Sequence, residues 1–207
     1  GPPTDPPELL EAMMKSGMDV ARFNFSHGTH DEHKRRLEML KDLRKKLNIP
    51  VAALLDTKGP EIRLKTFEKG EVYLETGQHF TLTAREVTGT REICSVTYKN
   101  LAQDVRLGSQ VMLDDGLISM KVVEKTETDV ICRVENGGAV KDRKGVNVPG
   151  VHLSMPYMSA QDRADIRFGI EEGFDFIAAS FCRTAQDAME IRRMLDENHS
   201  NMRIIAK

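Results

Sequence analysis

The sequence lacks a long block of one charge sign, a long apolar run and any cysteine spacing typical of a metal site. Its 30 basic and 32 acidic residues are mixed along the chain and give a net charge of −2, which gives little support to general attraction to nucleic acid or membranes. No stretch approaches the roughly 18 apolar residues of a membrane-spanning helix, and no signal peptide opens the chain. We therefore expect a soluble, cytoplasmic protein, with no nucleic-acid or membrane partner, that holds any anion in a local site.

The cysteines are few, and they are spread along the chain. Cys94, Cys132 and Cys182 are odd in number and far apart, and they lie in apolar, strand-like runs. Small buried thiols are common in such runs, and free thiols suit a reducing compartment. We interpret all three as structural thiols.

What the chain does have is an alternation of helix and strand patterns before residue 64. Asp5 is placed to cap a first helix, and Thr29-x-x-Glu32 is a capping box that predicts a second. Apolar runs at residues 20–25 and 51–55 predict buried strands, each followed by a polar loop. This part of the chain therefore reads as α-β-α-β.

The same alternation resumes after residue 152. Ser159 and Thr184 are each followed three residues later by aspartate, and both pairs open helices. Residues 174–181 and 202–207 predict two further buried strands. Helices between consecutive strands favour a parallel sheet.

Residues 64–152 follow a different pattern, with period-two alternation, turn glycines and no helix signals. We predict that they form a small all-β barrel inserted between residues 1–63 and 153–207. A (β/α)8 barrel needs about 250 residues and only about 120 here are α/β, so the predicted fold is α/β, a partial (β/α)8 TIM barrel carrying this insertion. A doubly wound sheet is the alternative, weakened because no Gly-x-Gly-x-x-Gly lies at a strand-to-helix turn.

The active site of such a barrel lies where its strands end. The polar residues at the predicted strand ends are Arg22, Asn24, Ser26, His27, Asp56, Thr57, Lys58, Arg63 and Lys207. Arg22 interrupts an apolar strand, and its planar fork suits a phosphate or carboxylate ligand as well as an internal ion pair with Asp56. The residues alone leave both readings open.

Other candidates have two readings as well. The oxygens of Asn24, Ser26, Asp56 and Thr57 suit a small cation, but they also suit ordinary loop capping. Lys207 is a solvated terminal charge, a catalytic cation or an imine-forming amine. Residues 141–144 form either a solvated turn or a loop that swings over a ligand.

Six segments occur in the order found in one known family. They are Asn24-Phe25-Ser26-His27-Gly28, Leu55-Asp56-Thr57-Lys58-Gly59-Pro60-Glu61-Ile62-Arg63, Asp114-Asp115-Gly116-Leu117-Ile118, Lys144-Gly145-Val146-Asn147-Val148-Pro149-Gly150, Ala179-Ser180-Phe181 and Ile204-Ile205-Ala206-Lys207. Together they make the sequence resemble the pyruvate kinase family over essentially all 207 residues.

The resemblance implies a (β/α)8 barrel with a small β lid domain inserted after its third strand. Gly1-Pro2 resembles the tail of the first barrel strand. The implied reaction is phosphoryl transfer from phosphoenolpyruvate to ADP, which gives ATP and pyruvate in glycolysis. The implied partners are phosphoenolpyruvate and ADP/ATP, and the intact enzyme would be a homotetramer.

The resemblance also implies roles for single residues. Arg22 would hold the transferring phosphoryl group and Lys207 would neutralise its oxygens. The remaining implied roles are potassium ligation by Asn24, Ser26, Asp56 and Thr57, and contacts on the nucleotide side by Arg63, His27, Lys144 and Asp115. Glu61 resembles the potassium-requiring branch of the family. The family's Mg²⁺ carboxylates follow the position of Lys207 and are absent from these 207 residues, so we expect the chain alone to be inactive.

Two other functions remain to be weighed. The first is an aldolase-like barrel in which Lys207 forms an imine, although the lid domain argues against it. The second is a truncated, non-catalytic binding module. Stabilisation by potassium or ADP without turnover would favour that module.

Overall fold

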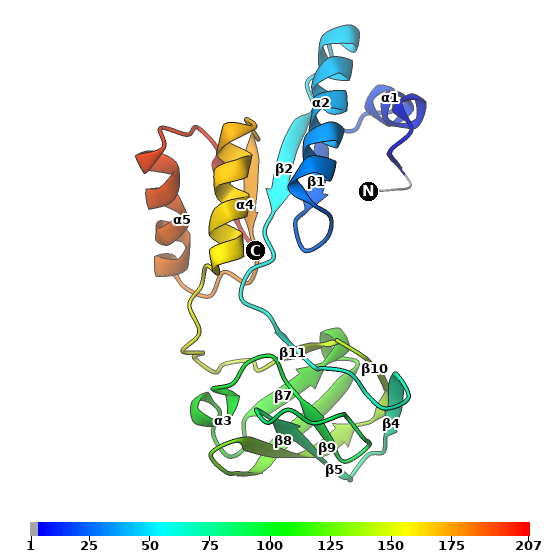
Figure 1. The fold of residues 1–207 in the computed structure, drawn as a ribbon, viewed down its shortest axis with the longest axis vertical. Coiled ribbons are helices and arrows are strands. Elements are labelled where there is room, and N and C mark those ends of the chain that lie inside the picture. Colours follow the sequence, from blue (N-terminus) through cyan, green and yellow to red (C-terminus); the bar gives the residue numbers. More distant parts are fainter. Residues whose placement is uncertain (1–3) are drawn as a thin grey trace. The chain divides into compact units, whose positions relative to one another are not determined.

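The computed structural model describes residues 4–207, which divide into two compact units (Figure 1). The α/β unit holds the chain up to Pro60 and again from Pro156 to Lys207, and the β unit is Glu61–Met155. The β unit begins at 61 rather than 64, because Ile62 and Arg63 form a strand that pairs within it, and it ends at 155 rather than 152. The predicted strand tail at Gly1-Pro2 lies outside the described residues.

The α/β unit alternates helices with parallel strands. Its elements are α1 (Pro7–Lys15), β1 (Val20–Asn24), α2 (His30–Leu47), β2 (Ala52–Asp56), α4 (Ala160–Glu171), β12 (Phe176–Ala179), α5 (Ala185–Glu197) and β13 (Arg203–Ala206). The strands form one parallel sheet in the order β1-β2-β12-β13. Sequential order in a parallel sheet with helical crossovers is the arrangement of a (β/α)8 barrel, and the prediction of a partial barrel is confirmed.

Alternation along each strand separates a packed face from a polar one. Phe23, Leu55 and Ile177 are buried in one cluster with the helices, whereas Arg22 and Asp56 point to the other side. Burying a side chain of this size contributes about 1.5–3 kcal/mol. The sequence therefore places its charged strand residues opposite the helices.

Three helices of the α/β unit begin with reciprocal caps between side chain and backbone. The pairs are Thr29 with Glu32, Ser159 with Asp162 and Thr184 with Asp187. The first helix does not use the predicted cap, because Pro6 occupies the cap position without a side-chain bond. Asp5 instead accepts hydrogen bonds of 2.7 and 2.9 Å from Arg36.

The β unit consists mainly of short strands. They are β3 (Ile62–Arg63), β4 (Glu71–Leu74), β5 (His79–Thr83), β6 (Ile93–Ser95), β7 (Gln110–Leu113), β8 (Ile118–Lys125), β9 (Asp129–Asn136), β10 (Gly138–Lys141) and β11 (Gly145–Asn147), with α3 (Leu101–Asp104) and η2 (Asp114–Gly116) between them. Seven strands form a sheet in the order β3-β11-β7-β8-β9-β5-β6, and β4 pairs with β10. An antiparallel bridge between Leu64 and Val96 joins the two ends of that sheet. The sheet thus closes on itself as a barrel around buried side chains such as Phe80 and Met120.

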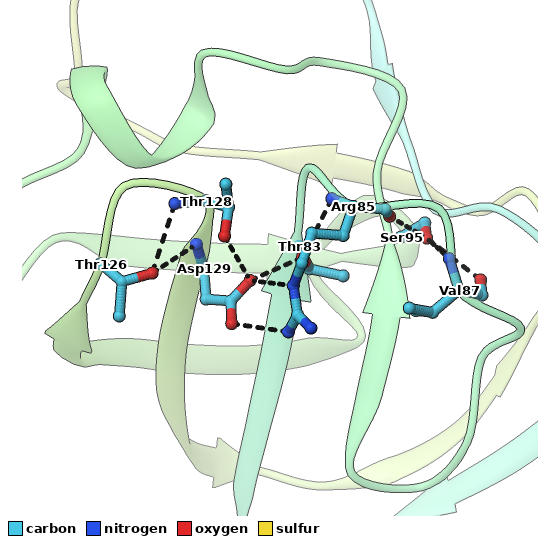
Figure 2. A network of polar contacts seen from close by, with 7 residues as sticks. All are labelled: Thr83, Arg85, Val87, Ser95, Thr126, Thr128 and Asp129. Carbon is cyan, nitrogen blue, oxygen red and sulfur yellow. Dashed lines mark hydrogen bonds and ion pairs between the residues drawn. The ribbon is translucent and has the colours of Figure 1, made fainter.

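A network of hydrogen bonds joins β5 to β9 at one end of this barrel (Figure 2). The Asp129 carboxylate accepts hydrogen bonds from the Thr83 hydroxyl at 2.6 Å, the Thr128 hydroxyl at 3.1 Å and the Arg85 guanidinium at 2.7 and 3.1 Å. Burial raises the pKa of Asp129, but these hydrogen bonds outweigh burial and the net pKa is lowered. Thr83 is fully buried, so Asp129 satisfies a hydroxyl that water does not reach.

We predict that Asp129→Ala destabilises the β unit by about 1–3 kcal/mol, because the buried Thr83 hydroxyl loses its acceptor. The lowered pKa makes the contribution of the carboxylate full above about pH 4 and lost as the pH falls further. Urea denaturation at pH 7 and pH 3 measures both effects. The exposed neighbour Glu127→Ala is the matched control, and equal stability of the two variants at pH 7 would contradict the prediction.

The three cysteines differ in burial. Cys94 and Cys132 are buried, and burial raises their pKa values to about 11 and about 12. Cys182 is half-buried, and all three thiols are free. None of the helices within residues 4–207 is both long and apolar enough to cross a membrane.

Candidate active site

Charged and polar side chains gather where the strands of the parallel sheet end. Asp56 is the last residue of β2, Lys207 directly follows β13, and Ser180 directly follows β12. Arg22 lies in β1, two residues before the partner of Asp56 in the strand register. The residues share this edge because parallel strands bring their carboxyl ends together.

Asp56 is the centre of the cluster. Its Oδ2 accepts from Arg22 Nε at 2.6 Å and lies 2.5 Å from Arg22 Nη2, while Lys207 Nζ donates to both oxygens at 2.7 and 2.9 Å. The Ser180 hydroxyl donates to Oδ1 at 2.7 Å. One carboxylate therefore holds an arginine and a lysine from two other strands in a fixed arrangement.

The cluster is anionic at its base and cationic where it meets solvent. The side chain of Asp56 is 2% exposed, whereas those of Arg22 and Lys207 are 58% and 51% exposed. Burial raises the pKa of Asp56, but hydrogen bonds from Lys207, Ser180 and Arg22 together outweigh it and lower the pKa. With Asp56 ionised, the three charged side chains carry a net charge of +1 and present it to an incoming anion.

The predicted potassium ligands lie on the ends of β1 and β2, but most of their oxygens are already engaged. Asn24 Oδ1 accepts from the Ser26 backbone amide at 3.0 Å. Thr57 Oγ1 accepts from the Ser180 amide at 3.1 Å and donates to the Ala178 carbonyl at 3.2 Å. The Asp56 carboxylate and the neutral oxygens of the other residues are of the chemical type that binds a hard monovalent cation. Lys207 donates to both Asp56 oxygens, so a cation bound here would share the carboxylate with Lys207.

The predicted nucleotide-side residues are divided between the two units. In the α/β unit, His27 joins Arg22 and Asn24 in lining a hollow of about 580 Å³ beside α1 and α2. The exposed side chain of His27 is on the loop after β1, and its carbonyl accepts from His33 Nε2 at 2.9 Å.

The other three residues belong to the β unit. Arg63 donates to the Arg143 carbonyl at 2.8 Å and pairs with Glu61 at 2.7 Å, a contact that raises the pKa of Arg63. Lys144 pairs with Asp114 at 2.9 Å. Asp115 follows Asp114 on η2, and both have positive φ, 49° for Asp114 and 56° for Asp115. Two such residues in a row make a tight turn, which aspartate adopts more readily than most other side chains.

Sequence reasoning missed two residues of these clusters, Ser180 and Asp114. Ser180 falls inside the strand predicted at residues 174–181, and only the structure ends that strand at Ala179 and so places Ser180 at the strand end, where site residues lie. Asp114 is chemically the same as its neighbour Asp115, and only the backbone decides which of them meets Lys144. Within residues 4–207, no three His, Cys, Asp or Glu side chains lie close enough to hold a metal ion together.

Comparison with known proteins gives the family. The family model described as "Pyruvate kinase, barrel domain" matches residues 1–207. The chain belongs to the pyruvate kinase family. Pyruvate kinases of Staphylococcus aureus strains USA300, NCTC 8325 / PS 47 and COL are each 46% identical to it over 209 residues. Each alignment covers 100% of this chain and 36% of the relative, so the chain spans about a third of the length of these pyruvate kinases.

Proposed function

We propose that these residues supply the phosphoenolpyruvate-binding part of a pyruvate kinase, an enzyme that transfers a phosphoryl group from phosphoenolpyruvate to ADP and yields ATP and pyruvate. The observation that carries the proposal is the Arg22–Asp56–Lys207 cluster at the ends of the parallel strands. Membership of the family supports the same reaction. Under this proposal the protein acts in glycolysis in the cytoplasm, and the intact enzyme is a homotetramer.

The chemistry of the cluster suits a transferring phosphoryl group. Phosphoryl transfer depends mainly on positioning and on neutralising charge on the equatorial oxygens. The Arg22 guanidinium offers a planar fork that can hold two of those oxygens, and Lys207 adds a point charge beside it. Because Asp56 holds both cations before the substrate arrives, little reorganisation is needed during the reaction.

The other predicted site residues would bind a cation and contact the nucleotide. Asn24, Ser26, Asp56 and Thr57 would hold K⁺, which supplies positive charge close to the phosphoryl group. Mg²⁺, held by carboxylates outside these 207 residues, would neutralise charge shared by the two phosphorylated substrates. Residues of the nucleotide side would be Arg63, His27, Lys144 and Asp115.

The geometry favours this function over imine formation at Lys207. An imine-forming lysine needs a neutral amine that is open to a carbonyl carbon. Lys207 Nζ instead donates to both oxygens of a buried carboxylate, so the amine is engaged by Asp56 rather than open to a carbonyl carbon. The role of an electrostatic catalyst therefore fits Lys207 better.

The proposal is tested by turnover in two forms of the protein. We expect these 207 residues, placed in the matching segment of the Staphylococcus aureus relative, to support transfer from phosphoenolpyruvate to ADP in the presence of Mg²⁺ and K⁺. The 207 residues alone are expected to show no turnover, since the proposal assigns the Mg²⁺ carboxylates to residues outside them. An ATP-detection assay measures both, and an inactive but folded hybrid would refute the proposal.

The isolated chain supplies the second half of the test. Turnover by the isolated chain near that of the hybrid would show that Mg²⁺ ligands outside it are not required. Stabilisation of the isolated chain by K⁺ or ADP, without turnover in the hybrid, would point instead to a non-catalytic binding module.

A further inference from the structure

Ser180 is the residue through which the charged cluster meets the rest of the α/β unit. Its side chain is buried, at 3% exposure, and its hydroxyl donates to Asp56 Oδ1 at 2.7 Å. Its amide donates to the Thr57 hydroxyl at 3.1 Å, and its carbonyl accepts from the Tyr157 hydroxyl at 3.2 Å. All three polar groups of this serine are therefore used, two by the consecutive residues Asp56 and Thr57 and one by Tyr157.

Thr57 and Tyr157 belong to the two connections between the α/β unit and the β unit. The outgoing connection runs from Thr57 to Pro60, and the incoming one begins at Pro156. In the outgoing connection, a Cβ on Gly59 would lie 2.5 Å from the Ser180 carbonyl oxygen, so that this backbone passes directly against Ser180. In the incoming connection, the buried Tyr157 bonds to the same carbonyl.

The backbone at Ser180 is also constrained. The next residue, Phe181, has φ of 54°, so its backbone is in the left-handed region. Its side chain is 44% exposed and is therefore not packed inside the core. That conformation is unfavourable for an aromatic residue and persists only where its surroundings impose it. The contacts of Ser180 with Asp56, Thr57 and Tyr157 supply such surroundings.

We propose that Ser180 is a positioning residue: its hydroxyl fixes the Asp56 carboxylate, and its backbone links that carboxylate to both connections of the β unit. Displacement of either connection would then move the carboxylate that holds Arg22 and Lys207. The inference rests on the proposed function of that cluster. It adds a residue that touches neither substrate nor cation and acts only through Asp56.

The test compares Ser180→Ala with a hydroxyl deletion elsewhere in the same unit. Thr184 is the N-cap of α5, and its hydroxyl accepts a hydrogen bond from the Asp187 amide at 3.2 Å, so Thr184→Ala removes this cap. Thr184 is not part of the charged cluster. In the hybrid enzyme we expect Ser180→Ala to lower kcat about 10-fold, with KM for phosphoenolpyruvate changed less than about 3-fold. Ser180→Cys, which keeps a weak donor, should give an intermediate loss, and Thr184→Ala should keep the parent kcat.

A second readout does not depend on activity. Amide hydrogen exchange of residues 57–59 and 157–159 should be faster in Ser180→Ala and in Tyr157→Phe than in the parent, and unchanged in Thr184→Ala. If the parent hybrid shows no turnover, the proposed function fails, and the exchange data still decide whether Ser180 holds the connections.

Three results would overturn the inference. An unchanged kcat in folded Ser180→Ala would show that the hydroxyl does not position Asp56. An equal fall of kcat in Thr184→Ala would reduce the effect to general stability. If exchange of residues 57–59 and 157–159 in Tyr157→Phe and Ser180→Ala matches the parent, the link to the connections is wrong.

Discussion

Replacing Asp56 with alanine is expected to lower kcat/KM by about 1,000-fold in the hybrid enzyme, the loss typical of a preorganised charge arrangement. The carboxylate is the common anchor of Arg22 and Lys207, and without it each cation adopts many side-chain conformations in solvent. The variant also removes one of the proposed potassium ligands. Steady-state kinetics with phosphoenolpyruvate, ADP, Mg²⁺ and K⁺ measures the loss.

The same substitution should leave the protein folded. Arg22 and Lys207 are 58% and 51% exposed, so neither becomes an unpaired buried charge when Asp56 is removed. The main cost is the unsatisfied hydroxyl of buried Ser180, about 1–3 kcal/mol. A large loss of activity beside a modest loss of stability separates a functional cluster from a structural ion pair.

A comparable carboxylate, Asp175, lies in the same sheet where the strands begin rather than where they end. Asp175 accepts from Arg44 and from the Ala53 amide, both at 2.7 Å, so Asp175→Ala likewise removes an arginine pair and a hydrogen bond. It lies before β12 rather than after it, away from the strand ends that carry Arg22 and Lys207. We expect Asp175→Ala to keep the parent kcat. Retention of more than about a tenth of the activity by Asp56→Ala would contradict the central role of the cluster.

The sequence predicts the α/β elements well because their signals are local. Apolar runs mark the four parallel strands, and Thr29, Ser159 and Thr184 mark helix starts within one turn of chain. Asp5 carries the same kind of signal but bonds to Arg36, from a helix far along the chain. The local capping pattern gives no information about Arg36 as a competing partner of Asp5.

The site follows from the sequence only in part. Once strands are known to be parallel, their ends must meet, which brings Arg22, Asp56 and Lys207 to one edge. The sequence leaves open whether Arg22 binds a ligand or Asp56, and the structure shows the ion pair. Ser180 depends on the backbone bend at Phe181, which no spacing of residue types reveals.

Gly59→Ala should be the most destabilising of the simple glycine substitutions in the α/β unit, costing about 3 kcal/mol or more. Its φ of 68° already disfavours a side chain by about 1 kcal/mol. The new Cβ would also lie 2.5 Å from the Ser180 carbonyl oxygen and 3.1 Å from its carbon, and these backbone atoms cannot rotate away. The chain at residues 57–60, or Ser180 itself, must shift.

Substitution of Gly173 separates the cost of the positive φ from the cost of the close contact with Ser180. Its φ of 70° matches that of Gly59 and it belongs to the same unit, but the nearest atom to its Cβ would be the flexible Lys41 Nζ at 4.0 Å. Gly173→Ala should therefore cost only the backbone term, about 1 kcal/mol. Urea denaturation followed by circular dichroism measures both variants, and equal losses would show that close contact with Ser180 is unimportant. Because the displaced carbonyl belongs to the residue that holds Asp56, Gly59→Ala should also lower kcat in the hybrid enzyme, whereas Gly173→Ala should not.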